Sequence, residues 1–245
     1  MFGETYSQIY DEVHSGKDYE SEAKQVLSIL NSVVNSGNPL VLDFGCGTGR
    51  HADKLREYGI KIRGYDPNPF MVGQARKNFP DISVTDKIEQ LPNNFDFLYS
   101  LFDVFSYQLS DLEVSLFLDQ MNSLVKPNAW ILIDGWHLPG LEIDPPKSRS
   151  RSFQHNGQTL SRNVDVVSID GLRVSELNIS IRDLATSKEI FSEIHTLRAF
   201  DSSEIQVLIR NLGGHELTFF DGTDFTKPLT NNSWRFAAVF QTASE

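Results

Sequence analysis

Along the first 140 residues, segments with the hydrophobic spacing of helices alternate with short apolar segments typical of strands. Apolar residues three or four positions apart predict an amphipathic helix from Tyr19 to about Asn35. An apolar strand from Pro39 to Phe44 then leads through a glycine-rich turn into a helix that begins near Arg50. Strands are expected next at 60–66, 82–86, 95–101 and 130–134, and helices at 69–79 and 111–125. This alternation predicts a parallel sheet with helices on both of its faces.

The pattern changes from about residue 150 to residue 200, where apolar and polar residues alternate as in strands. Asp170-Gly171 and residues 183–188 are turn signals, so we expect three antiparallel strands laid over the ends of the parallel ones. A helix at 201–212 and two strands at 216–220 and 234–241 would complete the sheet. We therefore expect a core of residues 1–149 and 201–245 that carries an insertion of residues 150–200.

The turn after the first strand holds three glycines at every second position, Gly45, Gly47 and Gly49, with Asp43 before them. A dinucleotide-binding turn usually reads G-x-G-x-x-G and receives a pyrophosphate. An acid at the strand end would repel a pyrophosphate but suits a ligand that carries an ammonium or sulfonium group. The spacing thus favours a cationic nucleoside-like ligand over a dinucleotide. An ordinary glycine turn is the remaining alternative.

Two further strands end in acids, Asp66 and Asp86. Ligands of open parallel sheets bind beyond the carboxyl ends of the strands, so Asp66 is placed to accept the hydroxyls of a ribose. Asp86 could accept the exocyclic amine of an adenine, with a main-chain N–H near Lys87 or Ile88 reaching the ring, and Met71 could lie against the adenine edge. An NAD-binding protein would use Asp66 in the same way, and a helix-capping aspartate is the alternative for that residue.

Composition narrows the class of protein. The chain has 245 residues, which suits a single domain, and its formal charge of −11 argues against a nucleic-acid surface. No apolar run reaches the roughly 20 residues that cross a bilayer, and the first residues lack signal-peptide character, so the cytoplasm is expected. The single cysteine, Cys46, excludes an intrachain disulfide and a cysteine metal cluster, and we expect no metal. Inside the glycine turn, Cys46 suits a small residue beneath a cofactor better than a nucleophile.

The segment Asp43-Phe44-Gly45-Cys46-Gly47-Thr48-Gly49 resembles motif I of the class I S-adenosylmethionine (SAM) methyltransferases. A closer resemblance, to the TDP-aminosugar N,N-dimethyltransferases of macrolide sugar pathways, covers nearly the whole chain. It is carried by residues 10–11, 16–19, 22–23, 100–103, 107, 136, 193–197 and 200. The resemblance implies an α/β fold with a Rossmann-like seven-stranded sheet and an antiparallel β insertion after the fifth strand.

The same resemblance implies SAM as the donor, S-adenosylhomocysteine as its product, and an amine on a nucleotide-linked sugar as the acceptor. An N-terminal tyrosine lies near the amine in that family, a role that would fall to Tyr10. The residues expected to bind the cofactor are Tyr19, Asp43, Gly45, Cys46, Gly47, Gly49, Asp66, Pro67, Met71, Asp86, Lys87, Ile88 and Leu101. The chain departs from the family at 139–158 and 222–232, so the identity of the acceptor stays open.

The acceptor is expected beside the fourth and fifth strands, where aromatic residues follow the strand ends, although a satellite hydrophobic cluster explains Phe102, Phe105 and Tyr107 equally well. The residues expected to contact it are Tyr10, Phe105, Tyr107, Trp136, His137 and Arg151. His137 is the candidate proton acceptor, although a hydrogen-bonded loop histidine explains it as well. For His195 a structural role is favoured. Arg149, Arg151 and Arg162 could meet a diphosphate or simply form a solvated face.

Three functions are therefore compared. The favoured one is a SAM-dependent N-methyltransferase acting on a small molecule, with O-methylation as the variant that would need His137 or His195 as a base. A nicotinamide-dependent oxidoreductase and a non-catalytic SAM-binding protein are the alternatives from other classes. Nucleic acids and membranes are not expected as partners, and a homodimer is considered.

Overall fold

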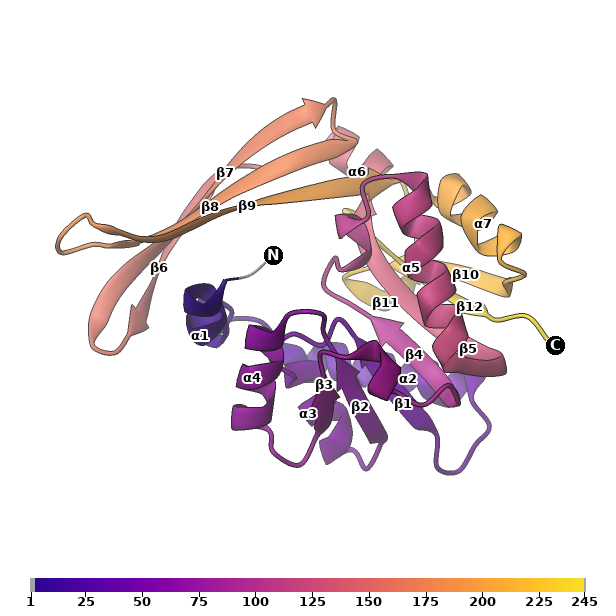
Figure 1. The fold of residues 1–245 in the computed structure, drawn as a ribbon. Helices are drawn as coiled ribbons and strands as arrows, with labels where there is room; N and C mark the ends of the chain where they lie inside the picture. Colours follow the sequence, from indigo (N-terminus) through magenta and orange to yellow (C-terminus); the bar gives the residue numbers. More distant parts are fainter. Residues whose placement is uncertain (1–2, 245) are drawn as a thin grey trace.

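The computed structural model describes residues 3–244, and the strands of its first half form a parallel sheet (Figure 1). Their order is β3-β2-β1-β4-β5, so the order reverses between β1 and β4. The strands are β1 (Leu40–Phe44), β2 (Lys61–Tyr65), β3 (Ser83–Thr85), β4 (Phe95–Ser100) and β5 (Val125–His137). Such a reversal leaves a crevice at the carboxyl ends of the central strands, where ligands bind in sheets of this kind.

Helices cover both faces of this sheet, because successive strand residues point to opposite sides. Val41 and Phe97 face α2 (Tyr19–Val33), α3 (Arg50–Glu57) and α4 (Pro69–Asn78). Leu42 and Leu98 face the opposite layer, α5 (Asp111–Leu124) and α7 (Ser202–Asn211). All four side chains are fully buried, and burial of one such side chain stabilises the fold by about 1.5–3 kcal/mol. The two cores therefore hold the strand ends in fixed positions.

Antiparallel strands complete the sheet beyond β5. β12 (Arg235–Gln241) pairs with β5, and β10 (His215–Asp221) pairs with β12. A short strand, β11 (Asp224–Pro228), pairs with β10 in the connection between them. The resulting order β3-β2-β1-β4-β5-β12-β10 confirms the Rossmann-like seven-stranded α/β fold expected from the sequence.

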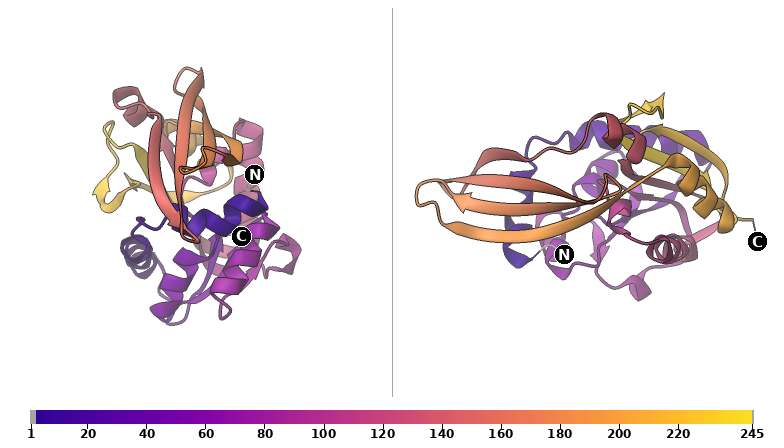
Figure 2. Two further views of the ribbon diagram at one scale, coloured as in Figure 1. Left: turned by 90° about the vertical axis from the view of Figure 1, so that its left-hand side faces the viewer. Right: turned by 90° about the horizontal axis from the view of Figure 1, so that it is seen from above.

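Four antiparallel strands, rather than the three expected, rise from the end of β5. They are β6 (Arg149–His155), β7 (Gln158–Asp170), β8 (Val174–Asp183) and β9 (Glu189–Phe200), and β9 joins β5 at His137. The missed strand, β6, is paired with β7 through Asn156-Gly157, whose φ angles of 47° and 78° suit a tight hairpin. Figures 1 and 2 show this meander arching over the carboxyl ends of the parallel strands.

An N-terminal helix, α1 (Glu4–Val13), lies beneath the meander. Tyr6, Ile9 and Val13 are buried against Met71 of α4 and the inner face of β7 and β8. The short elements η1 (Ile88–Gln90), η2 (Phe105–Tyr107) and α6 (Leu138–Ile143) lie in the connections. α1 therefore closes one side of the space between the parallel strands and the meander.

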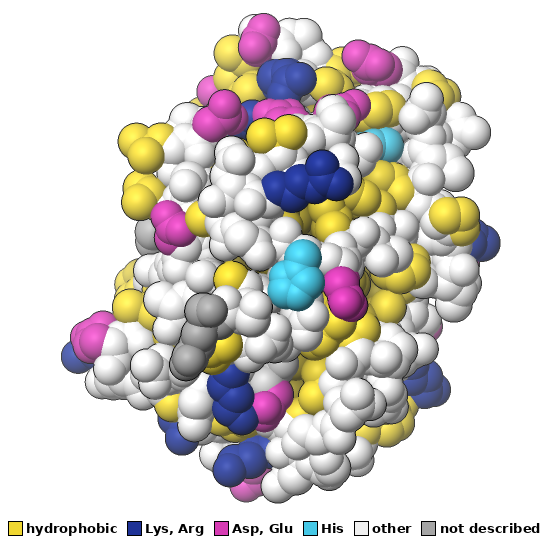
Figure 3. All heavy atoms as spheres, turned by 90° about the vertical axis from the view of Figure 1, so that its right-hand side faces the viewer, with side chains coloured by type: hydrophobic (Ala, Val, Ile, Leu, Met, Phe, Trp, Pro, Cys, Tyr) yellow, Lys and Arg dark blue, Asp and Glu magenta, His cyan; other side chains and the backbone are white. Residues whose placement is uncertain are grey.

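Figure 3 shows one outer face of the molecule. On this face acidic and basic side chains are interspersed, and apolar side chains reach the surface between them. No helix within residues 3–244 combines the length and apolar character of a membrane span.

Candidate active site

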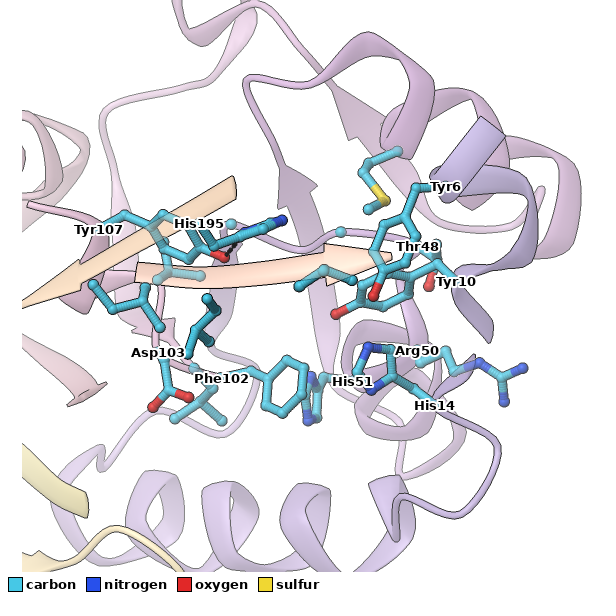
Figure 4. A pocket seen from close by; sticks show the side chains of 18 of the residues that line it. Tyr6, Tyr10, His14, Thr48, Arg50, His51, Phe102, Asp103, Tyr107 and His195 are labelled. Atoms are coloured by element: carbon cyan, nitrogen blue, oxygen red, sulfur yellow. Dashed lines mark hydrogen bonds between the residues drawn. The ribbon is translucent and has the colours of Figure 1, made fainter. Parts of the chain in front are cut away.

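A cavity of about 650 Å³ lies between the carboxyl ends of the parallel strands and the inner face of the meander. One wall consists of the glycine turn, Asp66 and Met71, and we call it the strand-end wall. The facing wall carries Arg149, Arg151, Arg162, Leu177, Ile179 and His195, and we call it the meander wall. In Figure 4, Tyr6, Tyr10 and His14 of the N-terminal segment stand opposite Tyr107 and His195.

The glycine turn exposes its backbone to the cavity. Gly45, Gly47 and Gly49 have φ angles of 86°, 53° and 82°, values that residues with a Cβ rarely adopt. A Cβ on Gly47 would meet no other atom within 4 Å, so it would project into the cavity. A Cβ on Gly45 would lie 2.8 Å from Cγ2 of Val104. The turn therefore offers a ligand close contact with main-chain atoms.

Asp66 stands at the end of β2 with its carboxylate at the cavity. Its Oδ2 accepts the N–H of Gly47 and its Oδ1 accepts the N–H of Asn68, each at 2.9 Å. Burial raises the pKa of Asp66, and the two N–H donors counteract that rise. Each carboxylate oxygen retains a lone pair, so Asp66 can also accept ligand hydroxyl groups.

Aromatic residues of the N-terminal segment line one side of the cavity, between the strand-end wall and the meander wall. The ring centroid of His14 lies 4.4 Å from that of Tyr10 and 5.4 Å from that of Phe102. Burial, assisted by the positive charges of Arg162 and Arg151, lowers the pKa of His14 to about 3. Burial also raises the pKa of Tyr10 well above its ordinary value. Both rings are therefore uncharged at neutral pH and exclude water.

The loop after β4 is held in an unusual conformation by Asp134 of β5. Phe102 and Asp103 have φ angles of 69° and 65°, a strain of about 1–3 kcal/mol for each residue. The Asp134 carboxylate accepts both of their N–H groups, at 3.0 and 2.9 Å. Arg235 donates to Asp103 at 2.5 Å from the adjacent strand β12. Burial and the charge of Asp103 raise the pKa of Asp134 to about 7.

Three arginines concentrate positive charge on the meander wall. Arg151 of β6 and Arg162 of β7 are directly opposite in register, and Arg149 is two residues from Arg151 on the same face. None of the three forms an ion pair with another described residue, although Arg162 Nε donates to the Tyr6 hydroxyl at 3.2 Å. Burial and the charge of Arg162 lower the pKa of both Arg149 and Arg151. Like charges in such proximity favour an anionic ligand.

Most of the residues predicted from the sequence come together around this cavity. Those that line it are Tyr10, Tyr19, Gly45, Cys46, Gly47, Asp66, Met71, Leu101, Tyr107, Trp136 and Arg151. The Cys46 thiol is buried and its pKa is raised well above the ordinary value, mainly by burial, which suits a packing residue. Their individual roles in binding stay predictions.

Two predicted acceptor residues point away from the cavity, which corrects their placement. His137 is 2% exposed, and its Nδ1 donates to the Ser233 carbonyl at 3.0 Å. It follows Trp136 on β5, and successive strand residues face opposite sides, so only Trp136 reaches the cavity. Phe105 is 0% exposed and packs against Phe117 and Phe200. Neither side chain is placed to contact an acceptor.

The remaining predicted cofactor residues lie around the strand-end wall without lining the cavity. Asp43 is buried beneath the turn near the N–H of Ala52, and burial raises its pKa to about 7. A Cβ on Gly49 would lie 3.2 Å from Cβ of Ala75, so this glycine serves the packing of α3 on α4. Pro67, Asp86, Lys87 and Ile88 follow β2 and β3 outside the lining residues.

Sequence reasoning missed several lining residues, including His14, His51 and Arg235, and it favoured a structural role for His195, which also lines the cavity. Tyr6, Tyr10 and His14 recur every four residues, which is a helical stripe that the sequence contained. Arg235 had no comparable signal, because its place depends on the pairing of β12 with β5. Within residues 3–244, no group of three or more His, Cys, Asp or Glu side chains is arranged to hold a metal ion.

Comparisons with known proteins agree with this geometry. Residues 41–128 match a family model described as a methyltransferase domain. The chain is 23% identical over 219 residues to the dTDP-3-amino-3,4,6-trideoxy-alpha-D-glucopyranose N,N-dimethyltransferase of Streptomyces venezuelae, covering 87% of this chain and 91% of that protein.

Solved structures share the fold. A sugar N-methyltransferase from Streptoalloteichus superposes with a TM-score of 0.78 at 21% identity, over 100% of this chain and 95% of that one. A SAM-bound amino pentose methyltransferase from Micromonospora echinaspora has a TM-score of 0.73 at 20% identity, over 99% and 98% of the two chains.

The residues present fit SAM as the cofactor. The open space at Gly47 admits a ligand against the backbone, and Asp66 offers a carboxylate to hydroxyl groups at the end of β2. Residues 41–128 therefore form a methyltransferase domain, and the chain shares the fold of SAM-dependent methyltransferases and is similar over most of its length to dTDP-aminosugar N,N-dimethyltransferases.

Proposed function

We propose that this methyltransferase acts on an amine of an anionic small molecule, and that a nucleotide-linked amino sugar is the acceptor. The observation that carries this proposal is the group Arg149, Arg151 and Arg162, which lines the same cavity as the glycine turn and has no carboxylate partner within residues 3–244. The protein as a whole carries a formal charge of −11, so a local excess of cations is a specific feature of this cavity.

The strand-end wall holds the donor in this proposal. Asp66 accepts hydrogen bonds from ribose hydroxyls, and the backbone of Gly45, Cys46 and Gly47 contacts the donor closely. Asp86, Lys87 and Ile88 are assigned to the adenine from the end of β3, a role that rests on the motif and on their position in the chain. Tyr19 and Leu101 complete the contact from α2 and the end of β4.

The meander wall and α1 hold the acceptor. Guanidinium groups bind phosphate oxygens in two-pronged hydrogen bonds, so the arginines suit a diphosphate. Tyr10, Tyr107 and Trp136 surround the remaining space, where the sugar and its amine would lie. The domain division at residues 150–200 is proposed on the same grounds, because the meander supplies one wall and the sheet the other.

The chemistry requires alignment more than strong acids or bases. SAM, when bound, supplies a methyl group attached to a cationic sulfur. The chain orients a neutral amine toward that position, and such orientation can contribute about 7–11 kcal/mol to lowering the barrier. The buried rings of Tyr10 and Tyr19 and the half-buried ring of His14 exclude water from the reacting groups.

The test is methyl transfer from labelled SAM to three acceptors: a nucleotide-linked amino sugar, the same amino sugar without its nucleotide, and the nucleotide sugar with a hydroxyl in place of the amine. We expect a methylated amine from the first, a KM at least about tenfold higher for the second, and no product from the third. An O-methylated product, or equal KM values for the first two, would contradict the proposal.

A matched pair of variants locates the anion site. Arg151→Met should raise the KM for the nucleotide sugar about tenfold and leave the dissociation constant of S-adenosylhomocysteine unchanged. Arg182→Met serves as the control, because Arg182 lies on β8 outside the cavity and pairs with Glu189. An equal effect of the two substitutions would argue against an anion site on the meander wall.

A further inference from the structure

Three side chains form a line of hydrogen bonds on one side of the cavity. The Tyr107 hydroxyl lies 2.6 Å from Nδ1 of His195, and Nε2 of His195 is bonded to the Glu193 carboxylate (Figure 4 shows the first of these bonds). Glu193 and His195 are two residues apart on β9, so both face inward, and Tyr107 ends the turn η2. Two elements far apart in the chain thus build one connected group.

The directions of these bonds follow from the chemistry of the groups. An ionised glutamate only accepts, so Nε2 of His195 carries a proton and donates it. The neutral imidazole then has an unprotonated Nδ1, which accepts the O–H of Tyr107. The Tyr107 oxygen keeps a lone pair for another donor. Tyr107 is 39% exposed and lines the cavity, whereas His195 is only 3% exposed, so a ligand meets this group through the tyrosine.

We propose that Tyr107, His195 and Glu193 form a proton relay that deprotonates the amine acceptor, an inference that rests on the function proposed above. At neutral pH a sugar amine is largely an ammonium, which has no electron pair to attack a methyl group. Its N–H bond breaks as the proton passes to the Tyr107 oxygen and the Tyr107 proton passes to Nδ1 of His195. The electron pair stays on the nitrogen, and the imidazolium that forms is balanced by Glu193.

The proton is afterwards returned from His195 through Tyr107 to water when the product leaves, so the relay is restored without another reactant. Tyr107 is the catalytic residue, because it touches the acceptor. His195 and Glu193 act through it, with the logic of a serine–histidine–aspartate triad in which the carboxylate stabilises the imidazolium.

The surroundings favour this direction of transfer. The charged and titratable groups near Tyr107 are Asp103 from the loop after β4, Glu193 from β9, Tyr6 and Tyr10 from α1, and Arg162 from β7. Asp103 and Glu193 attract the ammonium of the acceptor toward Tyr107, and Glu193 is hydrogen-bonded to the imidazole that receives the proton. Burial raises the pKa of Tyr107, so the tyrosine conducts the proton as a neutral hydroxyl.

The pH dependence of kcat/KM for the amine acceptor tests the relay. In Tyr107→Phe and His195→Gln, kcat/KM should fall about tenfold per pH unit below the pKa of the amine itself, because these variants depend on amine that arrives already neutral. At pH 7 we expect a loss of about 10- to 100-fold, and at pH 10 recovery to near the native value. The dissociation constant of S-adenosylhomocysteine should not change. His215→Gln is the control, since His215 is exposed on β10.

The outcomes separate the relay from the proposed function. Native enzyme that methylates amines, with both variants showing its own pH profile, would overturn the relay and leave the function standing. Native enzyme that methylates no amine at any pH would overturn both. Nitrogen NMR of labelled histidine provides a second readout: His195 should carry its proton on Nε2, and Tyr107→Phe should shift its Nδ1 resonance. A proton on Nδ1 would also overturn the relay.

Discussion

The two walls of the cavity differ in whether their charged side chains have partners within the protein. On the strand-end wall, Asp66 is bonded to two backbone N–H groups of its own chain. On the meander wall, Arg149 and Arg151 have no carboxylate partner within residues 3–244 and face Arg162. The first arrangement organises the glycine turn before any ligand arrives. The second leaves like charges close together with no carboxylate between them, so an anion that binds there relieves their repulsion.

This difference suggests that the strand-end wall provides affinity for the cofactor and that the meander wall provides selectivity for the acceptor. A wall that is already hydrogen-bonded loses little conformational freedom on binding, so it suits a cofactor common to a family. A wall of unpaired cations discriminates by charge, since a neutral acceptor would leave it uncompensated. The predictions below test this division, beginning with the largest expected effect.

Asp66→Ala should weaken the binding of S-adenosylhomocysteine by about 100-fold or more. The substitution removes the acceptor for Gly47 and Asn68 and for the ribose hydroxyls, and a hydrogen bond to a charged group contributes about 1.5–3 kcal/mol. Calorimetric titration measures the dissociation constant. Asp81→Ala is the control, because Asp81 is exposed in the turn before β3. A change below tenfold in Asp66→Ala would place the ribose elsewhere.

Acid should destabilise the native fold through His14. Its pKa is about 3 in the fold and 6.5 ordinarily, so between these values the unfolded chain binds a proton that the folded chain does not. Stability therefore falls as the pH falls below 6.5, by about 2 kcal/mol at pH 5 from this residue. Denaturant unfolding of the native protein and of His14→Phe at pH 7 and pH 5 measures this contribution, because His51 and His137, whose pKa values are also lowered by burial, are common to both proteins.

The same measurement connects the two sides of the cavity. The charges of Arg162 and Arg151 contribute to the low pKa of His14, but burial is the larger cause. Arg151→Met should therefore reduce the loss of unfolding free energy between pH 7 and pH 5 without removing it. His215→Phe is the control for His14→Phe, because His215 is exposed and its replacement should leave the acid sensitivity of the fold unchanged. Equal acid sensitivity in the native protein and in His14→Phe would show that His14 is protonated in the fold.

Both walls could be predicted from the sequence only to the extent that local periodicity determines them. The strand-end wall follows from strands of five or six residues with acids at their ends, and the parallel order brings Asp66 to the glycine turn. The meander wall depends on hairpin register, and the Asn156-Gly157 turn that defines β6 was overlooked. Arg151 and Arg162 become neighbours only through that register.

The two histidines illustrate the same limit. His137 and His195 both lie in strands at the cavity, and sequence reasoning favoured His137 as the proton acceptor. A strand residue faces one side or the other according to its parity, and a shift of one position reverses the result. Pairing of β9 with β8 and β5 turns His195 inward, whereas His137 points to Ser233. No local pattern contains that information.

Gly47→Ala and Gly59→Ala should separate backbone strain from ligand contact. The two glycines have φ angles of 53° and 82°, and a Cβ on either would meet no atom within 4 Å. Both variants should lose about 1–2 kcal/mol of unfolding free energy, because alanine resists positive φ. Only Gly47 lines the cavity, so only Gly47→Ala should also weaken S-adenosylhomocysteine, by about tenfold. Equal binding by the two variants would exclude close contact at the turn.

The smallest expected effect is a gain in stability. Arg151→Met should raise the free energy of unfolding by roughly 0.5 kcal/mol, since it removes one of two like charges directly opposite on β6 and β7 and retains the aliphatic stem. Arg182→Met, which removes the ion pair with Glu189, should instead lose a few tenths of a kcal/mol. Urea unfolding of both variants without ligand measures the difference. A loss of more than 1 kcal/mol in Arg151→Met would mean that the chain itself neutralises this arginine, and the meander wall would then resemble the strand-end wall.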